Sequence, residues 1–162
     1  MTKDPERDER AKRKQRATEL IEQKEYLLAL NFINQEKRRD LDQEYLMVIN
    51  GLIVSGEESF QRENYSEAGL FFRKVLENYP GRKSMRAKVE RPREWLVSRI
   101  TTFSEKLMVQ GLSEYREGNL PAAIETWKKI LRFNPGYQPA KKAIETTEAQ
   151  LKNLKSIDGK GR

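Results

Sequence analysis

Few side chains in this sequence could do chemistry. The 162 residues include no histidine and no cysteine, so the commonest general base, Ser–His or Cys–His arrangements and disulfides are all excluded. Glu57 and Glu58 could share acid–base work or a cation, but paired carboxylates on a charge-rich helix usually face solvent. Gly159-Lys160-Gly161 has the residue types of a phosphate loop, but it lies in a polar tail with no strand before it. We therefore predict no enzyme activity, no metal site and no cofactor.

The second candidate feature is a surplus of basic residues. The formal net charge is +7, and the stretch from Arg82 to Arg99 alone holds seven basic and two acidic residues, a net charge of +5 beside Trp95. Such a patch could attract an acidic protein, anionic lipid or nucleic acid. The alternative is an ordinary solvated surface, and no motif for sequence-specific nucleic-acid recognition is present. The predicted basic patch consists of Arg82, Lys83, Arg86, Lys88, Arg91 and Arg93.

The elements that carry these residues follow from an internal repeat. Two stretches match at identical offsets, which favours helical hairpins. In each, the glycine lets the second helix approach the first closely, and the proline ends the second helix. Gly56, Phe60, Tyr65, Ala68, Phe72, Leu76 and Pro80 correspond to Gly111, Tyr115, Leu120, Ala123, Trp127, Leu131 and Pro135.

This order of residues resembles the tetratricopeptide repeat: a small residue, two aromatic or large residues around a short turn, an alanine, a bulky residue and a proline. A degenerate first copy begins at Ala17 and loses the pattern after Ile33. The resemblance covers about residues 10–155 and implies an all-α superhelix of about three hairpins, as in bacterial proteins with such repeats. We predict repeats over 10–41, 42–80 and 92–135, a capping helix over 138–157, and tails at 1–9 and 158–162.

The spacing between the repeats departs from the family. The first and second copies are 39 residues apart and the second and third 55 apart, against about 34 in the family. The excess lies between Pro80 and Ser104. One interpretation is a single helix from Pro92 to about Glu117, about 39 Å long, that projects beyond its neighbours. The other is a break near Thr101 and Thr102 that leaves a separate extra helix. The sequence leaves open whether 81–103 is loop, extra helix or part of one long helix.

The resemblance also implies a concave groove lined by the first helix of each hairpin. An apolar centre with polar edges suits a partner's hydrophobic segment or amphipathic helix. The alternative is that these apolar residues are core. The family's lysine and asparagine pattern that clamps a terminal carboxylate is absent. The groove positions are Asn50, Ile53, Glu57, Phe60 and Gln61 in the second hairpin, and Glu105, Met108, Leu112, Tyr115 and Arg116 in the third.

The sequence thus predicts a non-enzymatic protein-interaction module, a scaffold or assembly factor that binds a partner protein or peptide. We expect Ile53, Phe60, Met108, Leu112 and Tyr115 to bind the partner and Glu57 and Arg116 to orient it. The alternative is a basic adaptor that binds nucleic acid or an anionic membrane through residues 82–99, and self-association through the long helix is a third possibility. No apolar run is long enough to span a membrane, and the polar start lacks a signal peptide. For a complete chain this predicts the cytoplasm.

Overall fold

The computed structural model describes residues 4–36 and 39–161. Within these residues the chain is all-α, which confirms the predicted fold class, and it contains no strand. The elements are α1 (Pro5–Glu22), α2 (Tyr26–Glu36), the 3₁₀ turn η1 (Arg39–Leu41), α3 (Asp42–Gln61), α4 (Tyr65–Glu77), α5 (Lys83–Arg86), α6 (Arg93–Arg116), α7 (Leu120–Phe133) and α8 (Gln138–Lys160).

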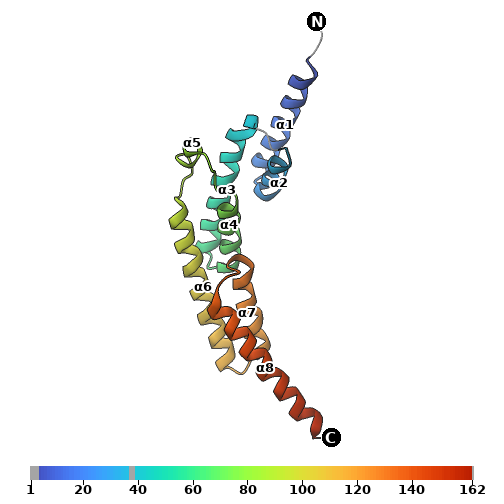
Figure 1. Ribbon diagram of the computed structural model, residues 1–162, viewed down its shortest axis with the longest axis vertical. Coiled ribbons are helices and arrows are strands. Elements are labelled where there is room, and N and C mark those ends of the chain that lie inside the picture. Colours follow the sequence, from blue (N-terminus) through green and yellow to red (C-terminus); the bar gives the residue numbers. More distant parts are fainter. Residues whose placement is uncertain (1–3, 37–38, 162) are drawn as a thin grey trace.

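The long helices form an elongated body with the two ends of the chain far apart (Figure 1). Each long helix packs against the next one along the chain, and α4 contacts α6 directly, past the short helix α5. The helices α4 and α7 also touch, so the α3–α4 and α6–α7 pairs share one core. Part of α1 lies free of the body at one end and part of α8 at the other (Figure 1).

Three tight turns, between α1 and α2, α3 and α4, and α6 and α7, have the same geometry. In each, one residue adopts a left-handed backbone conformation: Lys24 at φ 58°, Glu63 at φ 59° and Gly118 at φ 83°. Their N–H groups donate to Ile21, Phe60 and Tyr115 at 2.9, 2.9 and 3.0 Å, which satisfies carbonyls at the helix ends. These residues lie at the same offset from Ala17, Gly56 and Gly111, so the turns follow the sequence repeat.

Two of the repeated glycines contact the bulky residue of the following helix. A Cβ placed on Gly56 would meet the Phe72 ring, and one on Gly111 would meet the Trp127 ring, each closer than 3.0 Å. Both rings are buried. The predicted close approach therefore occurs at the same place in both pairs, and any side chain larger than hydrogen would separate the helices.

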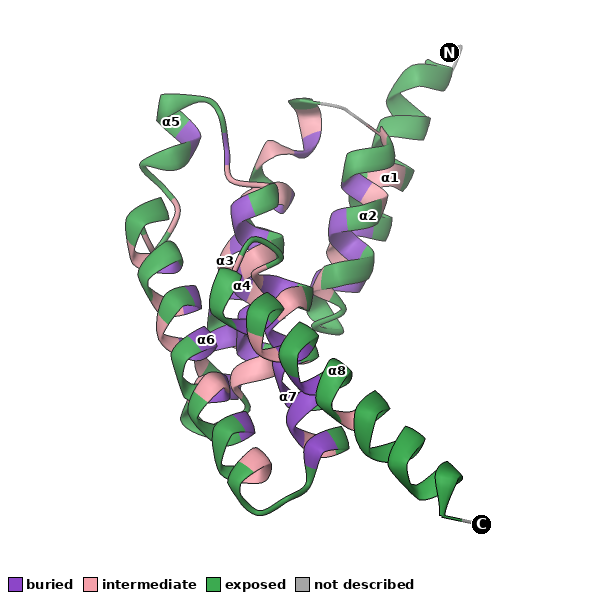
Figure 2. Ribbon diagram, turned by 60° about the horizontal axis from the view of Figure 1, so that its bottom comes forward, coloured by how far each residue is buried: buried purple, intermediate pink, exposed green. Residues whose placement is uncertain are grey.

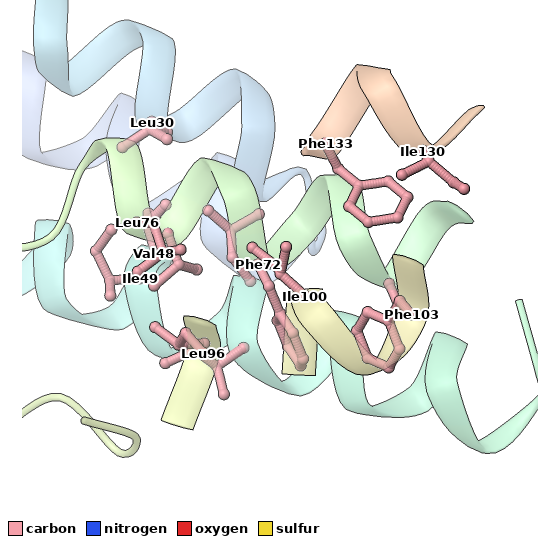
Figure 3. Packing of buried hydrophobic residues seen from close by; sticks show 14 of the residues in the cluster. Leu30, Val48, Ile49, Phe72, Leu76, Leu96, Ile100, Phe103, Ile130 and Phe133 are labelled. Atoms are coloured by element: carbon pink, nitrogen blue, oxygen red, sulfur yellow. The ribbon is translucent and has the colours of Figure 1, made fainter. Parts of the chain in front are cut away.

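Helix α6 is continuous and has two packing partners. Thr101 and Thr102 donate their hydroxyls to Val97 and Ser98 carbonyls one turn back, at 3.2 and 3.1 Å, without breaking the helix. The first half packs on α4, where Phe103 stacks on Phe72 with ring centroids 5.7 Å apart (Figure 3). The second half packs on α7. Of the two interpretations of 92–117, the structure has the single helix, preceded by the separate short helix α5. The prediction that it projects beyond its neighbours is wrong, because each half has its own partner.

Both predicted tails are wrong over the residues that the structure describes. Helix α1 begins at Pro5 instead of about Arg10, because the Asp4 side chain accepts a hydrogen bond from the Glu6 N–H at 3.1 Å and proline fits the first turn. Helix α8 continues to Lys160, three residues beyond the predicted end of the capping helix at 157. The rest of the predicted tails, residues 1–3 and 162, lies outside the described residues, as do residues 37–38 of the predicted first repeat.

Candidate interaction surfaces

The second-hairpin half of the predicted groove is filled by the protein itself. Ile53 is completely buried, so it is core and not a contact surface. Phe60 packs on Phe103 of α6, with ring centroids 5.3 Å apart, and the Arg99 guanidinium lies 5.3 Å from its ring centroid. Glu57 accepts two hydrogen bonds from Arg91, at 2.8 and 2.6 Å. These three predicted groove residues therefore stabilise the contact between α3 and the following part of the chain.

Helix α6 covers Phe60, and the rest of the filling is a connecting segment, residues 81–92, that leads through α5 into α6. Asn50 holds its backbone with both ends of one amide: Nδ2 donates to the Lys88 carbonyl at 3.1 Å, and Oδ1 accepts from the Glu90 N–H at 3.0 Å. Tyr79 donates its hydroxyl to the Arg91 carbonyl at 2.9 Å, and burial raises the pKa of this phenol. The connecting segment thus occupies the space beside α3 that a peptide would need.

Most residues of the predicted basic patch form ion pairs or hydrogen bonds with the rest of the chain. Arg82 pairs with Asp42, and Arg91 pairs with Glu57 and lies 4.6 Å from the Trp95 ring centroid. The guanidiniums of Arg86 and Arg93 donate to backbone carbonyls, at 2.5 Å to Gly81 and 3.4 Å to Leu76. Lys83 and Lys88 are exposed. Carboxylates thus balance the charges of Arg82 and Arg91, whereas Arg86 and Arg93 are exposed and keep their charge beside the two lysines.

The third-hairpin half of the predicted groove is open. A groove of about 420 Å³ runs between α6 and α8, and Trp127 of α7 is among its lining residues. Met108, Leu112 and Tyr115 line it from α6, and Leu112 is 40% exposed. Arg116 is exposed but does not line this groove. The opposite wall comes from α8 and consists of Pro139, Lys142, Ala143, Thr146 and Thr147.

The groove contains one large apolar residue that the sequence analysis missed. Val109 is 69% exposed, the highest exposure among the large apolar residues of the described chain, and it lies beside Met108 and one turn before Leu112. The signal available in the sequence was weak: a β-branched valine within a predicted helix, where its helix propensity is lower. Together Met108, Val109 and Leu112 give the groove an apolar wall.

Hydrogen bonds from buried and half-buried rings hold both walls of the groove in place. Trp127 donates its indole N–H to the Met108 carbonyl at 3.3 Å, which joins α7 to the middle of α6. Tyr115 donates its hydroxyl to Gln150 Oε1 at 2.8 Å, which joins the end of α6 to α8. The groove therefore exists without a ligand, and binding would not have to order it first.

The residues singled out for chemistry do not form a shared site. Glu57 is paired with Arg91 while Glu58 is exposed, and Lys160 is the last residue of helix α8. Over residues 4–36 and 39–161, no group of three or more acidic side chains is placed to hold a metal ion. Within the same residues, no helix combines the length and apolarity needed to cross a bilayer.

Comparison of this chain with protein-family models, with curated proteins and with solved structures gives no match.

Proposed function

We propose that the chain is a non-enzymatic protein-interaction module, related in plan to tetratricopeptide repeats, that binds a partner in the groove between α6 and α8. The observation that carries this proposal is the groove itself: an open, preformed and mainly apolar channel with Val109 and Leu112 exposed along one wall. Exposed apolar side chains in a channel between helices are typical of sites for a partner's hydrophobic segment.

The repeat interpretation is supported by the three matching turns and by the two glycine–ring contacts, Gly56 with Phe72 and Gly111 with Trp127. Each pair of helices that shares these features forms one unit, and stacked units present their first helices along one face. The part of that face on α3 is closed by the connecting segment, so the proposed site is restricted to α6 and α8.

The preferred ligand is an amphipathic helix or a short apolar peptide. Lys142 is the only charged residue that lines the groove as the structure describes it, and Thr146 and Thr147 supply hydroxyls at the opposite edge from Leu112. An apolar floor with few polar groups favours a ligand that presents large aliphatic or aromatic side chains at helical spacing.

The test is affinity capture from a native extract with matched variants as bait. Val109→Asp with Leu112→Asp introduces two charges into the groove, and both positions are exposed enough for the fold to tolerate them. Val97→Asp is the matched control, because Val97 is a 48% exposed valine on the first half of the same helix. We expect partners that resist a high-salt wash to be captured by the wild type and the control but lost with the double variant.

The opposite pattern would support the basic adaptor instead. Lys83→Glu with Lys88→Glu reverses the two exposed lysine charges of the predicted basic patch and leaves its arginines, which contact the helices, unchanged. In that case the captured material is released by salt, is lost with the lysine variant and is still captured by the groove variant. This result would refute groove binding and identify a charge-driven surface.

A further inference from the structure

A second open cavity, of about 510 Å³, lies where the connecting segment enters α6. Its lining comes from residues 79–81, from residues 92–94 and from Arg86 of α5. None of these residues lines the groove between α6 and α8. Arg86 and Arg93 bring two guanidiniums to this cavity, and the proposed function makes no use of them.

Both guanidiniums have hydrogen-bond donors to spare. In the described part of the chain, neither Arg86 nor Arg93 lies within ion-pair distance of a carboxylate. Each donates through Nη1 to one backbone carbonyl, Arg86 to Gly81 at 2.5 Å and Arg93 to Leu76 at 3.4 Å. A guanidinium carries five N–H donors, so most of them on each side chain remain available to a ligand.

The walls of the cavity are fixed by contacts within the chain. Tyr79 donates its hydroxyl to the Arg91 carbonyl at 2.9 Å, and Pro80, the next residue, is buried. Pro92 forms the opposite end of the lining as the residue before α6. At Gly81 the cavity is open, because an added Cβ would meet nothing within 4 Å. Binding therefore would not have to order this part of the chain first.

We propose that this cavity binds a phosphate group, free or as a monoester, with Arg86 and Arg93 as its donors. A guanidinium presents its N–H groups as a planar fork that matches two oxygens of one anion. A phosphate monoester has three terminal oxygens and a charge of about −1.5 to −2 at pH 7, so it can accept from two forks at once. A carboxylate has two oxygens and a single negative charge, which makes it the weaker match.

Glu94 also lines the cavity and opposes an anion there. Burial and then the charge of Glu94 raise the pKa of the Tyr79 phenol, whereas Arg86 and Arg93 lower it, so the three charges act at the same place. Two arginines and one glutamate leave a net charge of +1 on the lining. Because the arginines are exposed, we expect weak binding, with a dissociation constant on the order of 1 mM at low salt.

The test is a titration of the whole chain with inorganic phosphate at low ionic strength, followed by amide NMR signals. Saturable shifts are expected for Gly81, Arg93 and Glu94, and no shift for Val109 in the groove. Acetate at equal ionic strength should bind at least about fivefold more weakly. The absence of saturable shifts up to about 20 mM phosphate, or equal binding of acetate, would overturn the proposal.

Variants with opposite expected effects locate the site. Arg86→Ala and Arg93→Ala should each weaken phosphate binding about tenfold, because each removes one charged donor set. Glu94→Gln, which is nearly isosteric, should strengthen binding about threefold, and this gain tests the site even if an arginine variant loses structure. Lys88→Ala is the matched control, because Lys88 is exposed and basic but does not line the cavity. A loss with Lys88→Ala equal to that with Arg86→Ala would show diffuse attraction and refute the site.

Phosphoserine distinguishes the two sources of the phosphate group. Binding of phosphoserine at least as tight as that of inorganic phosphate identifies an esterified phosphate as the ligand, and weaker or absent binding identifies the free anion. Either result supports the site. The inference does not depend on the proposed groove function, because Val109→Asp with Leu112→Asp should leave phosphate binding unchanged.

Discussion

The glycines at the repeated position give the sharpest test of how the helices pack. We consider Gly56→Ala and Gly111→Ala, each of which adds one methyl group. The new Cβ would lie 2.6 Å from Phe72 Cδ1 in the first variant and 2.7 Å from Trp127 Cδ1 in the second, against 3.4 Å or more in ordinary contacts. Phe72 Cε1 and Trp127 Nε1 would lie closer still, so each ring would have to move by about 1 Å, and both rings are enclosed by other core residues.

Two opposing effects set the change in the free energy of unfolding. Forcing an extra methyl group into a packed core costs up to about 3 kcal/mol. Replacing glycine by alanine inside a helix contributes about 1 kcal/mol in the opposite direction. We expect a net loss of about 2 kcal/mol, which corresponds to a fall in melting temperature of about 4–8 °C for a domain of this size. In Gly111→Ala the ring shift also weakens the indole hydrogen bond to Met108, so this variant should lose slightly more.

The assay is thermal and urea denaturation followed by helical circular dichroism. Gly159→Ala is the matched control, because Gly159 is also in a helix but nothing lies within 4 Å of an added Cβ. It should leave the melting temperature unchanged or raise it slightly. A melting temperature for Gly56→Ala equal to that of the control would show that Phe72 can move freely, and the close-packing argument would be wrong.

Three further outcomes are expected. Asn50→Ala removes both side-chain hydrogen bonds to the backbone of the connecting segment and should lower the free energy of unfolding by about 1–2 kcal/mol. The Glu90 amide hydrogen should then exchange faster with solvent. An unchanged exchange rate would mean that the segment is held without Asn50. Arg91→Ala should cost less than about 1 kcal/mol, because its pair with Glu57 is partly exposed, and a larger loss in urea denaturation would show that the stacking on Trp95 dominates. Burial raises the pKa of Tyr45 above its usual 10.0, so the phenol ionises in the unfolded chain first, and stability should fall as the pH rises above about 10. Tyr45→Phe should make the melting temperature fall less steeply over this pH range. An equal fall in both proteins would exclude Tyr45 as its source.

The parts of the fold that could be predicted from the sequence are those set by local or repeated signals. The turn after α3 is an example, because Asn64 accepts a hydrogen bond from the Glu67 N–H and begins the next helix as capping residues do. The glycine–ring contacts are another, because their steric reason is the same in both copies. The start of α1 was also encoded, by Asp4 before Pro5, and this signal was overlooked in favour of the strongly polar composition.

The parts that could not be predicted depend on contacts between distant residues. Glu57 and Arg91 are 34 positions apart, and nothing near either residue shows that they meet. The filled half of the groove was therefore predicted to be open, and the arginines were predicted to be a free basic patch. Thr101 and Thr102 are compatible with a continuous or a broken helix, and only the core on both sides of α6 decides between them.

Because α6 is shared by two helix pairs, its two halves cannot come apart independently. Because α6 is one continuous helix, moving it away from α7 also pulls Phe103 away from Phe72 and exposes the core between α4 and α6. In an ordinary repeat array, each unit can open at the cost of one interface. Here the middle of the chain, from α3 to α7, forms one cooperative block, while the free ends of α1 and α8 open without disturbing it. A helix that packs on two helix pairs thus makes both pairs unfold together.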